Sequence, residues 1–536
     1  MFDIMIKNGI IVDGSGESAF RGDIAVKDGK IVKIASSIDG DVKEVIDASG
    51  LQVTPGLIDS HSHSDKTIYK GSDCWNYLEQ GVTTQIAGQC GSSIAPYYDA
   101  LENKHGLTPE EVKEWKEKGK SPATFMAEAE KASLGNNMAY FIGHNAIRGN
   151  VMGFSDAKPT EEQLEAMKAY VKEAMEAGFL GLSTGLVYAP SVYADTDELI
   201  ELTKVMQPYN GIYVSHIRGE GINGLEAVKE AIKIGEEGNA PVFISHLKVI
   251  GKQNEGRSQL LLKEIDDAVA RGMEVWADQY PFTASSAPLL SQIPPKYLVG
   301  GASAFLERIE DPKNRKKILY SIFNEVDEFE SGIYSAGFEG SVVSGANHTP
   351  QYVNMSISEI AKEMGKEPID ALCDILKANH CAMQGIYFNQ CASDLIRIMS
   401  HPRVFCGSDW SNYPDERKDP EFVGGTHPRA TATMIRRLEL VRDFRLRTME
   451  QSIRNVTYDT AQALGIDDHG LLKEGWDANI CIMDYKRLHA TADFEHPYRK
   501  NQGIHYVLVN GAVAVRDGVA IKGARYGKLL KRRGAK

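Results

Sequence analysis

The feature that most constrains the fold is a regular alternation of short apolar segments with amphipathic segments between residues 55 and 465. Residues 161–177, for example, place apolar side chains at helical spacing and stop at Gly178. Strands that alternate with helices form parallel sheets, and eight such repeats close into a barrel. We therefore predict an α/β fold with a (β/α)8 TIM-like barrel, with strands at residues 57–60, 83–87, 139–142, 180–183, 212–215, 242–245, 274–277 and 404–407.

The two ends of the chain have a different pattern from the middle. Residues 1–54 and 466–536 contain β-branched runs that end at Asp-Gly or Asn-Gly pairs, which are typical of hairpins. We predict one small β-sandwich module built from both ends, with the barrel at residues 55–465 between them. The gap before the last barrel strand is too long for a simple crossover, which predicts an insertion at about residues 282–350.

Composition narrows the class of partner. A net charge of −13 disfavours binding to nucleic acid or to an anionic membrane, since both require a basic surface, and the basic residues 528–536 are expected to be solvated. The 7 cysteines lack the spacing of a disulfide scaffold, and the N-terminus has no signal-peptide pattern. We predict a cytoplasmic protein that acts on a small molecule, with no nucleic-acid or membrane partner. Assembly into a homo-oligomer is left open.

Residues that bind metals follow several of the predicted strands. His61 and His63 follow the first strand, and side chains two positions apart in an extended chain point to the same side. Further strands end at Cys90, His216, His246 and Asp409. Strand ends converge at the mouth of such a barrel, and a catalytic zinc ion usually has three protein ligands and a water molecule. A thiolate beside two imidazoles favours zinc over magnesium or manganese, although iron or cobalt also fits.

His144 follows the third predicted strand and has two interpretations. It could line the site and bind a polar group of the substrate, or it could support a residue that does so. The sequence alone does not decide between them.

The segment Pro55-Gly56-Leu57-Ile58-Asp59-Ser60-His61-Ser62-His63 resembles the signature of the amidohydrolase superfamily. Within it, the chain is similar to the N-acyl-D-amino-acid deacylases, or D-aminoacylases, over nearly its whole length, through the motifs Gly88-Gln89-Cys90-Gly91, Ser215-His216-Ile217-Arg218, Ser245-His246-Leu247-Lys248, Gly407-Ser408-Asp409 and Phe494-Glu495-His496-Pro497. The resemblance implies zinc-dependent hydrolysis of the acyl amide of an N-acyl-D-amino acid. It also implies one tight zinc site at Cys90, His216 and His246, and a weaker second position at His61, His63 and Asp409. Strand four has no lysine, which argues against the dihydroorotase and hydantoinase branch.

The resemblance also assigns roles to individual residues. Asp409 would take a proton from the attacking water as general base and pass it to the leaving amine as general acid. Lys248 and Tyr280 are nominated for the α-carboxylate of the substrate. Where the family has an arginine after the catalytic aspartate, this chain reads as Asp419-Pro420-Glu421, so either Arg417 or Arg429 substitutes or the substrate presents a different group there, such as an amine.

Two tyrosines and two rival functions complete the predictions. Tyr188 and Tyr193 follow strand four and could line the side-chain or acyl pocket, or pack at the surface.

One rival function is that of an amidohydrolase acting on a cyclic amide or on a dipeptide that contains a D-amino acid. The other is a catalytically inactive scaffold, but such proteins typically lose metal ligands, and this chain keeps the full set.

Overall fold

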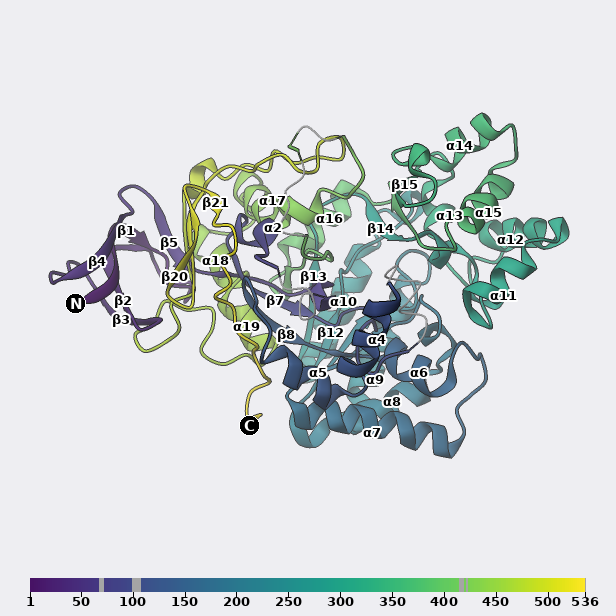
Figure 1. The fold of residues 1–536 in the computed structure, drawn as a ribbon, viewed down its shortest axis with the longest axis horizontal. Helices are drawn as coiled ribbons and strands as arrows, with labels where there is room; N and C mark the ends of the chain where they lie inside the picture. Colours follow the sequence, from purple (N-terminus) through teal and green to yellow (C-terminus); the bar gives the residue numbers. More distant parts are fainter. Residues whose placement is uncertain (67–71, 99–107, 414–418, 421–422, 536) are drawn as a thin grey trace.

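In the computed structural model, a β module, a barrel and an inserted subdomain follow one another across the molecule (Figure 1). The structure describes residues 1–66, 72–98, 108–413, 419–420 and 423–535. Within these ranges no helix is long and apolar enough to cross a membrane.

The barrel strands lie where the alternation predicts them. They are β6 (Leu57–Asp59), β7 (Val82–Ala87), β8 (Asn137–Tyr140) with its continuation β9 (Ile142–Gly143), β10 (Gly181–Gly185), β11 (Ile212–His216), β12 (Val242–Ile244), β13 (Val275–Gln279) and β17 (Val404–Cys406). Parallel pairing joins β6, β7 and β8 in one run, and joins β9 through β13 to β17 in another. The ring closes where Ser60 N donates to Cys406 O at 3.1 Å and Phe141 N donates to Ala87 O at 2.9 Å. The predicted barrel is confirmed.

Helices cover the outside of the barrel, and most of them are amphipathic. They are α2 (Trp75–Leu78), α4 (Pro109–Lys118), α5 (Pro122–Ala129), α6 (His144–Met152), α7 (Glu161–Ala177), α8 (Thr196–Lys204), α9 (Gly224–Gly238), α10 (Ser258–Ala270), α16 (Ala392–Ser400), α17 (Arg429–Asp443), α18 (Met449–Asn455) and α19 (Tyr458–Ala463). Helix α7 has the predicted bounds because Thr160 and Gln163 form a capping box at its start, and Gly178, with φ of 101°, ends it in the left-handed conformation.

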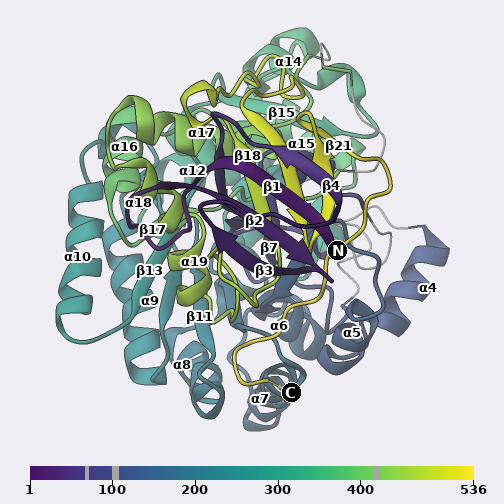
Figure 2. The same ribbon diagram turned by 90° about the vertical axis from the view of Figure 1, so that its left-hand side faces the viewer.

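Both ends of the chain contribute to the β module, whose sheet order is β21-β20-β19-β18-β5-β1-β2-β3, with β4 paired to β1. Strand β5 pairs antiparallel with β18, which joins the two ends, and Figure 2 shows the purple and yellow strands side by side. The strands are β1 (Phe2–Ile11), β2 (Phe20–Lys27), β3 (Lys30–Ala35), β4 (Val42–Asp47), β5 (Gln52–Pro55), β18 (Ile480–Met483), β19 (Ile504–Val509), β20 (Ala512–Arg516) and β21 (Val519–Ala520).

The inserted subdomain lies between β13 and β17 and has its own apolar core. It contains β14 (Ser285–Pro288), α11 (Gly301–Arg308), α12 (Pro312–Asn324), α13 (Gly332–Ala336), β15 (Ser341–Ala346), α14 (Ile357–Met364), α15 (Pro368–Ala378) and β16 (Met383–Tyr387). It therefore extends beyond the expected end near residue 350. The reason is its sheet, in which β16 lies between β14 and β15 and pairs antiparallel with both, so that the subdomain is incomplete without β16.

Residues 527–532 do not form a solvated tail, and that expectation is wrong for this segment. Met138 N donates to Lys528 O at 3.0 Å, and Leu530 N donates to Met138 O at 2.7 Å. Leu530 packs against the apolar interior of the barrel, which includes Phe141 and Leu180. Since Met138 lies early in β8, this segment, which we call the floor segment, covers the end of the barrel opposite to the predicted metal site.

Candidate metal centre and substrate cavity

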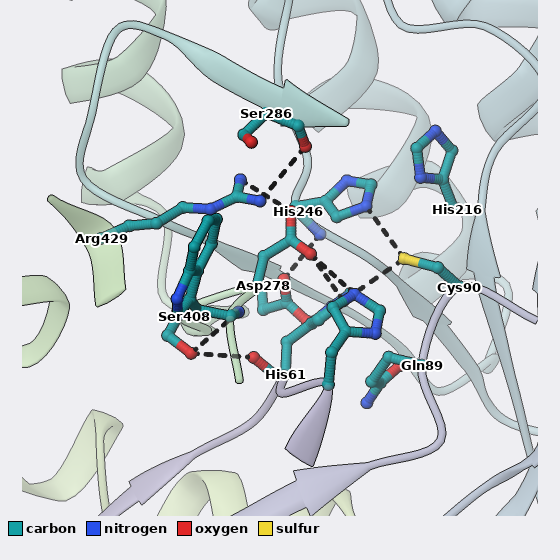
Figure 3. Close-up of polar contacts among 12 residues, drawn as sticks. His61, Gln89, Cys90, His216, His246, Asp278, Ser286, Ser408 and Arg429 are labelled. Atoms are coloured by element: carbon teal, nitrogen blue, oxygen red, sulfur yellow. Dashed lines mark hydrogen bonds and ion pairs between the residues drawn. The ribbon is translucent and has the colours of Figure 1, made fainter. Parts of the chain in front are cut away.

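The six predicted metal-binding residues meet at the carboxyl ends of the barrel strands. Their donor atoms form two overlapping groups, each with all atoms within 4.8 Å of one another: Cys90, His216 and His246 in one, and His61, His63, Cys90 and Asp409 in the other. Cys90 belongs to both groups, because its Sγ lies 3.3 Å from His246 Nε2 and 3.4 Å from His61 Nε2 (Figure 3).

The backbone turns sharply at three of these residues. Cys90, His246 and Asp409 have φ values of 53°, 35° and 51°, a region that residues other than glycine rarely adopt. Each stands just beyond a barrel strand, where the left-handed turn directs the side chain to the centre of the barrel mouth. Strained conformations of this kind persist where the surrounding structure enforces them, and they cluster at functional sites.

The charges at the centre favour a metal-binding thiolate. Burial raises the pKa of the Cys90 thiol, but the positive charges of His61 and His246 outweigh burial and hold the pKa well below its ordinary value. Burial alone would lower the pKa of His61, yet Asp278 and Cys90 raise it well above the ordinary value. The thiolate is the form of cysteine that binds metals.

The donor set fits a zinc ion. One sulfur and two imidazoles converge in the first group, and all three residues are buried. His216 Nδ1 is a buried nitrogen with no hydrogen-bond partner among the described residues, so it is available as a ligand. Thiolate and imidazole are the ligands that zinc prefers.

Asp409 lies between the centre and a buried arginine. Its Oδ1 is 2.9 Å from His63 Nε2, and its Oδ2 is 2.8 Å from Arg429 Nη1. Burial raises the pKa of this carboxyl, but Arg429 and His246 lower it well below its usual range, so Asp409 is ionised and can accept a proton. The charge state of Asp409 is the one that its predicted role as general base requires.

Arg429 is the first residue of α17 and is almost fully buried. Its guanidinium lies 4.7 Å from the ring centroid of Tyr280, and its Nη2 donates to Ser286 O at 3.2 Å. Arg429 Nε has no hydrogen-bond partner within the described structure. A cation therefore lies beside Asp409, although this chain reads Asp419-Pro420-Glu421 where the family has an arginine. Arg417 and Glu421 lie outside the described residues.

Lys248 is in the cavity as predicted, but it already has an anionic partner. Its Nζ lies 2.5 Å from Glu220 Oε1 and 2.6 Å from His246 Nδ1. Glu220 Oε1 is also 3.1 Å from His246 Nδ1. The positive charge of Lys248 is therefore largely balanced by Glu220, which the sequence analysis did not identify.

A cavity opens above the centre, between the barrel mouth and the inserted subdomain. The barrel side contributes Val187, Tyr188, His216, Gly219, Glu220, His246, Lys248, Ile250, Tyr280 and Asp409, and the other side contributes Ser285, Ser286, Ala287, Ser291, Gln292, Phe329, Glu330, Gly332, Tyr387 and Asn389. The structure thus brings Tyr188, Lys248 and Tyr280 to one cavity with the metal centre. The inserted subdomain forms its roof.

Three residues that the sequence singled out for the substrate site, Arg429, His144 and Tyr193, are not among the cavity residues. The His144 ring is fully buried, with Nδ1 2.7 Å from Ser191 Oγ and Nε2 2.9 Å from Glu198 Oε1, so both its nitrogens have partners. The Tyr193 hydroxyl donates to Pro295 O at 2.9 Å. His144 therefore connects the start of α6 to residues 191 and 198, and Tyr193 connects the loop after β10 to the inserted subdomain at residue 295.

Asp278 supports the centre from the end of β13, and the sequence analysis missed it. Its Oδ2 lies 3.2 Å from His61 Nδ1, and its Oδ1 accepts the backbone N–H of His246 at 2.6 Å. Carboxylates commonly orient metal-binding histidines in this way. Its position directly after the predicted strand 274–277 was the available signal.

The chain matches the model of the Amidohydrolase family over residues 44–294 and 346–515. It is 30% identical to a D-aminoacylase of Alcaligenes xylosoxydans xylosoxydans over 538 residues, covering 100% of this chain and 98% of that protein. It is 31% identical to an N-acyl-D-aspartate deacylase of the same organism, covering 98% and 95%. The crystal structure of N-acyl-D-glutamate deacylase from Bordetella bronchiseptica, complexed with zinc and a phosphonate inhibitor that mimics the tetrahedral intermediate, superposes with a TM-score of 0.80 at 28% identity, covering 99% of both chains. The resemblance inferred from the motifs is confirmed.

Proposed function

The chain belongs to the amidohydrolase family, and we propose that it is a zinc-dependent enzyme that hydrolyses N-acyl-D-amino acids to a carboxylate and a free D-amino acid. The observation that carries this proposal is the convergence of Cys90, His216 and His246 beside an ionised Asp409, at the base of one cavity. The substrate is a small molecule. A cytoplasmic location and a homo-oligomer stay predictions.

Cys90, His216 and His246 would hold the tight zinc ion, and His61, His63 and Asp409 would form a second, weaker site that shares Cys90. A bound zinc ion supplies a water molecule with a lowered pKa and polarises the amide carbonyl. Both groups share Cys90, so one thiolate would serve both ions.

Asp409 would carry the proton between the two halves of the reaction. Its carboxylate lines the cavity and is ionised, so it can take the proton of the attacking water. The same oxygen can then deliver that proton to the amine nitrogen as the amide bond breaks. Arg429 at 2.8 Å holds the carboxylate in place during both transfers.

The α-carboxylate of the substrate would bind near Arg429 and Tyr280. Arg429 and Lys248 are each paired with a carboxylate, Asp409 and Glu220 respectively, and Arg429 lies buried behind the cavity wall with its Nε lacking an acceptor among the described residues. The Tyr280 hydroxyl accepts a hydrogen bond from Gln390 Nε2 at 3.1 Å and can still donate its own proton. Tyr188 would form the wall of the acyl pocket next to His216, whose ring centroid is 4.9 Å away.

The test is amine release by the zinc-loaded protein from paired D and L N-acetyl amino acids, with Cys90→Ala as control. Release from the D compounds alone, lost in the variant, is the expected result. No release from either series while zinc is still bound would contradict the proposal, and D-amino-acid dipeptides and cyclic amides would then be assayed.

A further inference from the structure

The two walls of the cavity differ in charge. On the barrel side, Glu220, Lys248 and Asp409 are charged, and Lys248 and Glu220 form an ion pair at 2.5 Å. Asp409 is paired with Arg429. On the side of the inserted subdomain, the described cavity residues are neutral except for one, Glu330.

Glu330 is a buried carboxylate without a basic partner in the described structure. The residue is 8% exposed, and its oxygens accept the backbone N–H groups of Gly221 and Ile222, both at 2.8 Å. The backbone N–H of Asn223 also acts on this carboxylate, which has about four acceptor positions, so about one remains open. Burial raises the pKa of Glu330 above its ordinary value, although these N–H groups oppose the shift. A buried anion that lacks a counter-charge is costly unless a ligand supplies one.

The neighbours of Glu330 suit the rest of a long side chain. Phe329 provides an apolar surface, and Gln292 and Ser291 provide neutral polar groups. The carboxamide of Gln292 is held in place, since its Oε1 accepts the N–H of Gly332 at 2.5 Å and its Nε2 donates to Ser291 Oγ at 3.0 Å. None of these residues offers a positive charge to an acidic substrate.

We propose that Glu330 makes the side-chain pocket selective for a cation, so that the preferred substrates are N-acyl-D-amino acids with an amine or guanidinium side chain. This inference rests on the proposed function and names its substrate class. The ammonium group replaces the missing counter-charge, and the methylene groups lie against Phe329. An acidic side chain is repelled by the same carboxylate.

The decisive comparison is between Nα-acetyl-D-lysine and Nα-acetyl-D-norleucine, which has the same methylene chain without the amine. We expect kcat/KM of the zinc-loaded enzyme to be at least about tenfold higher for the lysine compound, because a site built for a polar group discriminates strongly against an analogue that lacks it. Nα-acetyl-D-glutamate should be the poorest of the three. Equal rates for lysine and norleucine would overturn the inference while leaving deacylase activity intact. No release from any D compound would instead refute the proposed function, and the inference with it.

Glu330→Gln tests the residue itself. The ratio of kcat/KM for lysine to that for norleucine should fall by about tenfold, mainly through KM for the lysine compound. The matched control is Glu328→Gln, whose side chain is 71% exposed and which should leave the ratio at the wild-type value. A purely structural role, through Gly221 and Ile222, would lower both rates together and leave the ratio unchanged, which would overturn the assignment. The wild-type comparison stays decisive if the variant does not fold.

Discussion

Asp278→Asn should weaken zinc binding without changing any residue that would contact the metal. The Asp278 side chain is completely buried and accepts from two donors, His61 Nδ1 at 3.2 Å and the backbone N–H of His246 at 2.6 Å. Asparagine has nearly the same volume but only one side-chain oxygen. Whichever way its amide turns, an NH2 group faces one of these two donors.

The structure sets the size of the effect. A hydrogen bond to a charged group contributes about 1.5–3 kcal/mol, which corresponds to about 10- to 150-fold in an equilibrium constant. If the amide nitrogen faces His61, the ring must move its proton from Nδ1 to Nε2, the nitrogen 3.4 Å from Cys90 Sγ. That tautomer cannot donate a lone pair from Nε2 to a metal ion. We therefore expect zinc affinity at the second site, which His61 would help to form, to fall about 10- to 100-fold.

The assay is zinc competition against a chromophoric chelator, with metal content measured after dialysis. Asp266→Asn is the matched control, since its side chain is 62% exposed and lies at the surface near His401. Thermal unfolding of the metal-free proteins establishes that the variant is folded. A folded variant that binds zinc as tightly as the wild type would refute the assignment of Asp278 as the residue that orients His61 and His246.

Three further outcomes are expected. Cys90→Ala should lose the tightly bound zinc, detected as metal content after dialysis, and activity should fall by at least about a thousandfold, with no recovery at physiological zinc concentrations. Burial, and then Arg429, hold the pKa of His427 well below 6.5, so below that pH the unfolded chain binds a proton that the folded protein does not. The contribution of neutral His427 to the free energy of unfolding should be fully present above pH 6.5 and should fall by up to about 1.4 kcal/mol per pH unit below it. His427→Gln should flatten this pH dependence in denaturant titrations between pH 5 and 7.5, and an unchanged slope would contradict the role given to His427. Leu530→Ala should destabilise the protein by about 1–2 kcal/mol through lost packing at the barrel floor, whereas a change in kcat at unchanged stability would contradict a purely structural role.

The metal ligands could be predicted from the sequence because their positions follow from local rules. His61 and His63 share one side of an extended segment, and parallel strands bring their carboxyl ends together whatever the details of the loops. Cys90, His216 and His246 needed only the correct strand ends. The β7, β11 and β12 strands were recognisable as short apolar runs between helices.

Pairings between loops could not be predicted in the same way. Lys248 and Glu220 are 28 positions apart, and only the folded loop shows that Glu220 neutralises the lysine. His144 follows a barrel strand as expected, but α6 begins at that residue and directs its ring to Ser191 and Glu198. Sequence spacing fixes which strand a residue follows, whereas the direction of its side chain depends on the turn after the strand.

The floor segment bears on the order in which the protein folds. Lys528 N donates to the side-chain oxygen of Asn137, 391 positions earlier, and the adjacent residues complete the barrel at β8. The floor segment must therefore emerge from the ribosome before the barrel can reach its final form. The inserted subdomain, which has its own core, can fold much earlier. Contacts between such distant positions slow folding. During synthesis the open end of the barrel would expose apolar side chains, and exposed apolar surface of this kind makes a folding intermediate prone to aggregation until the floor segment binds.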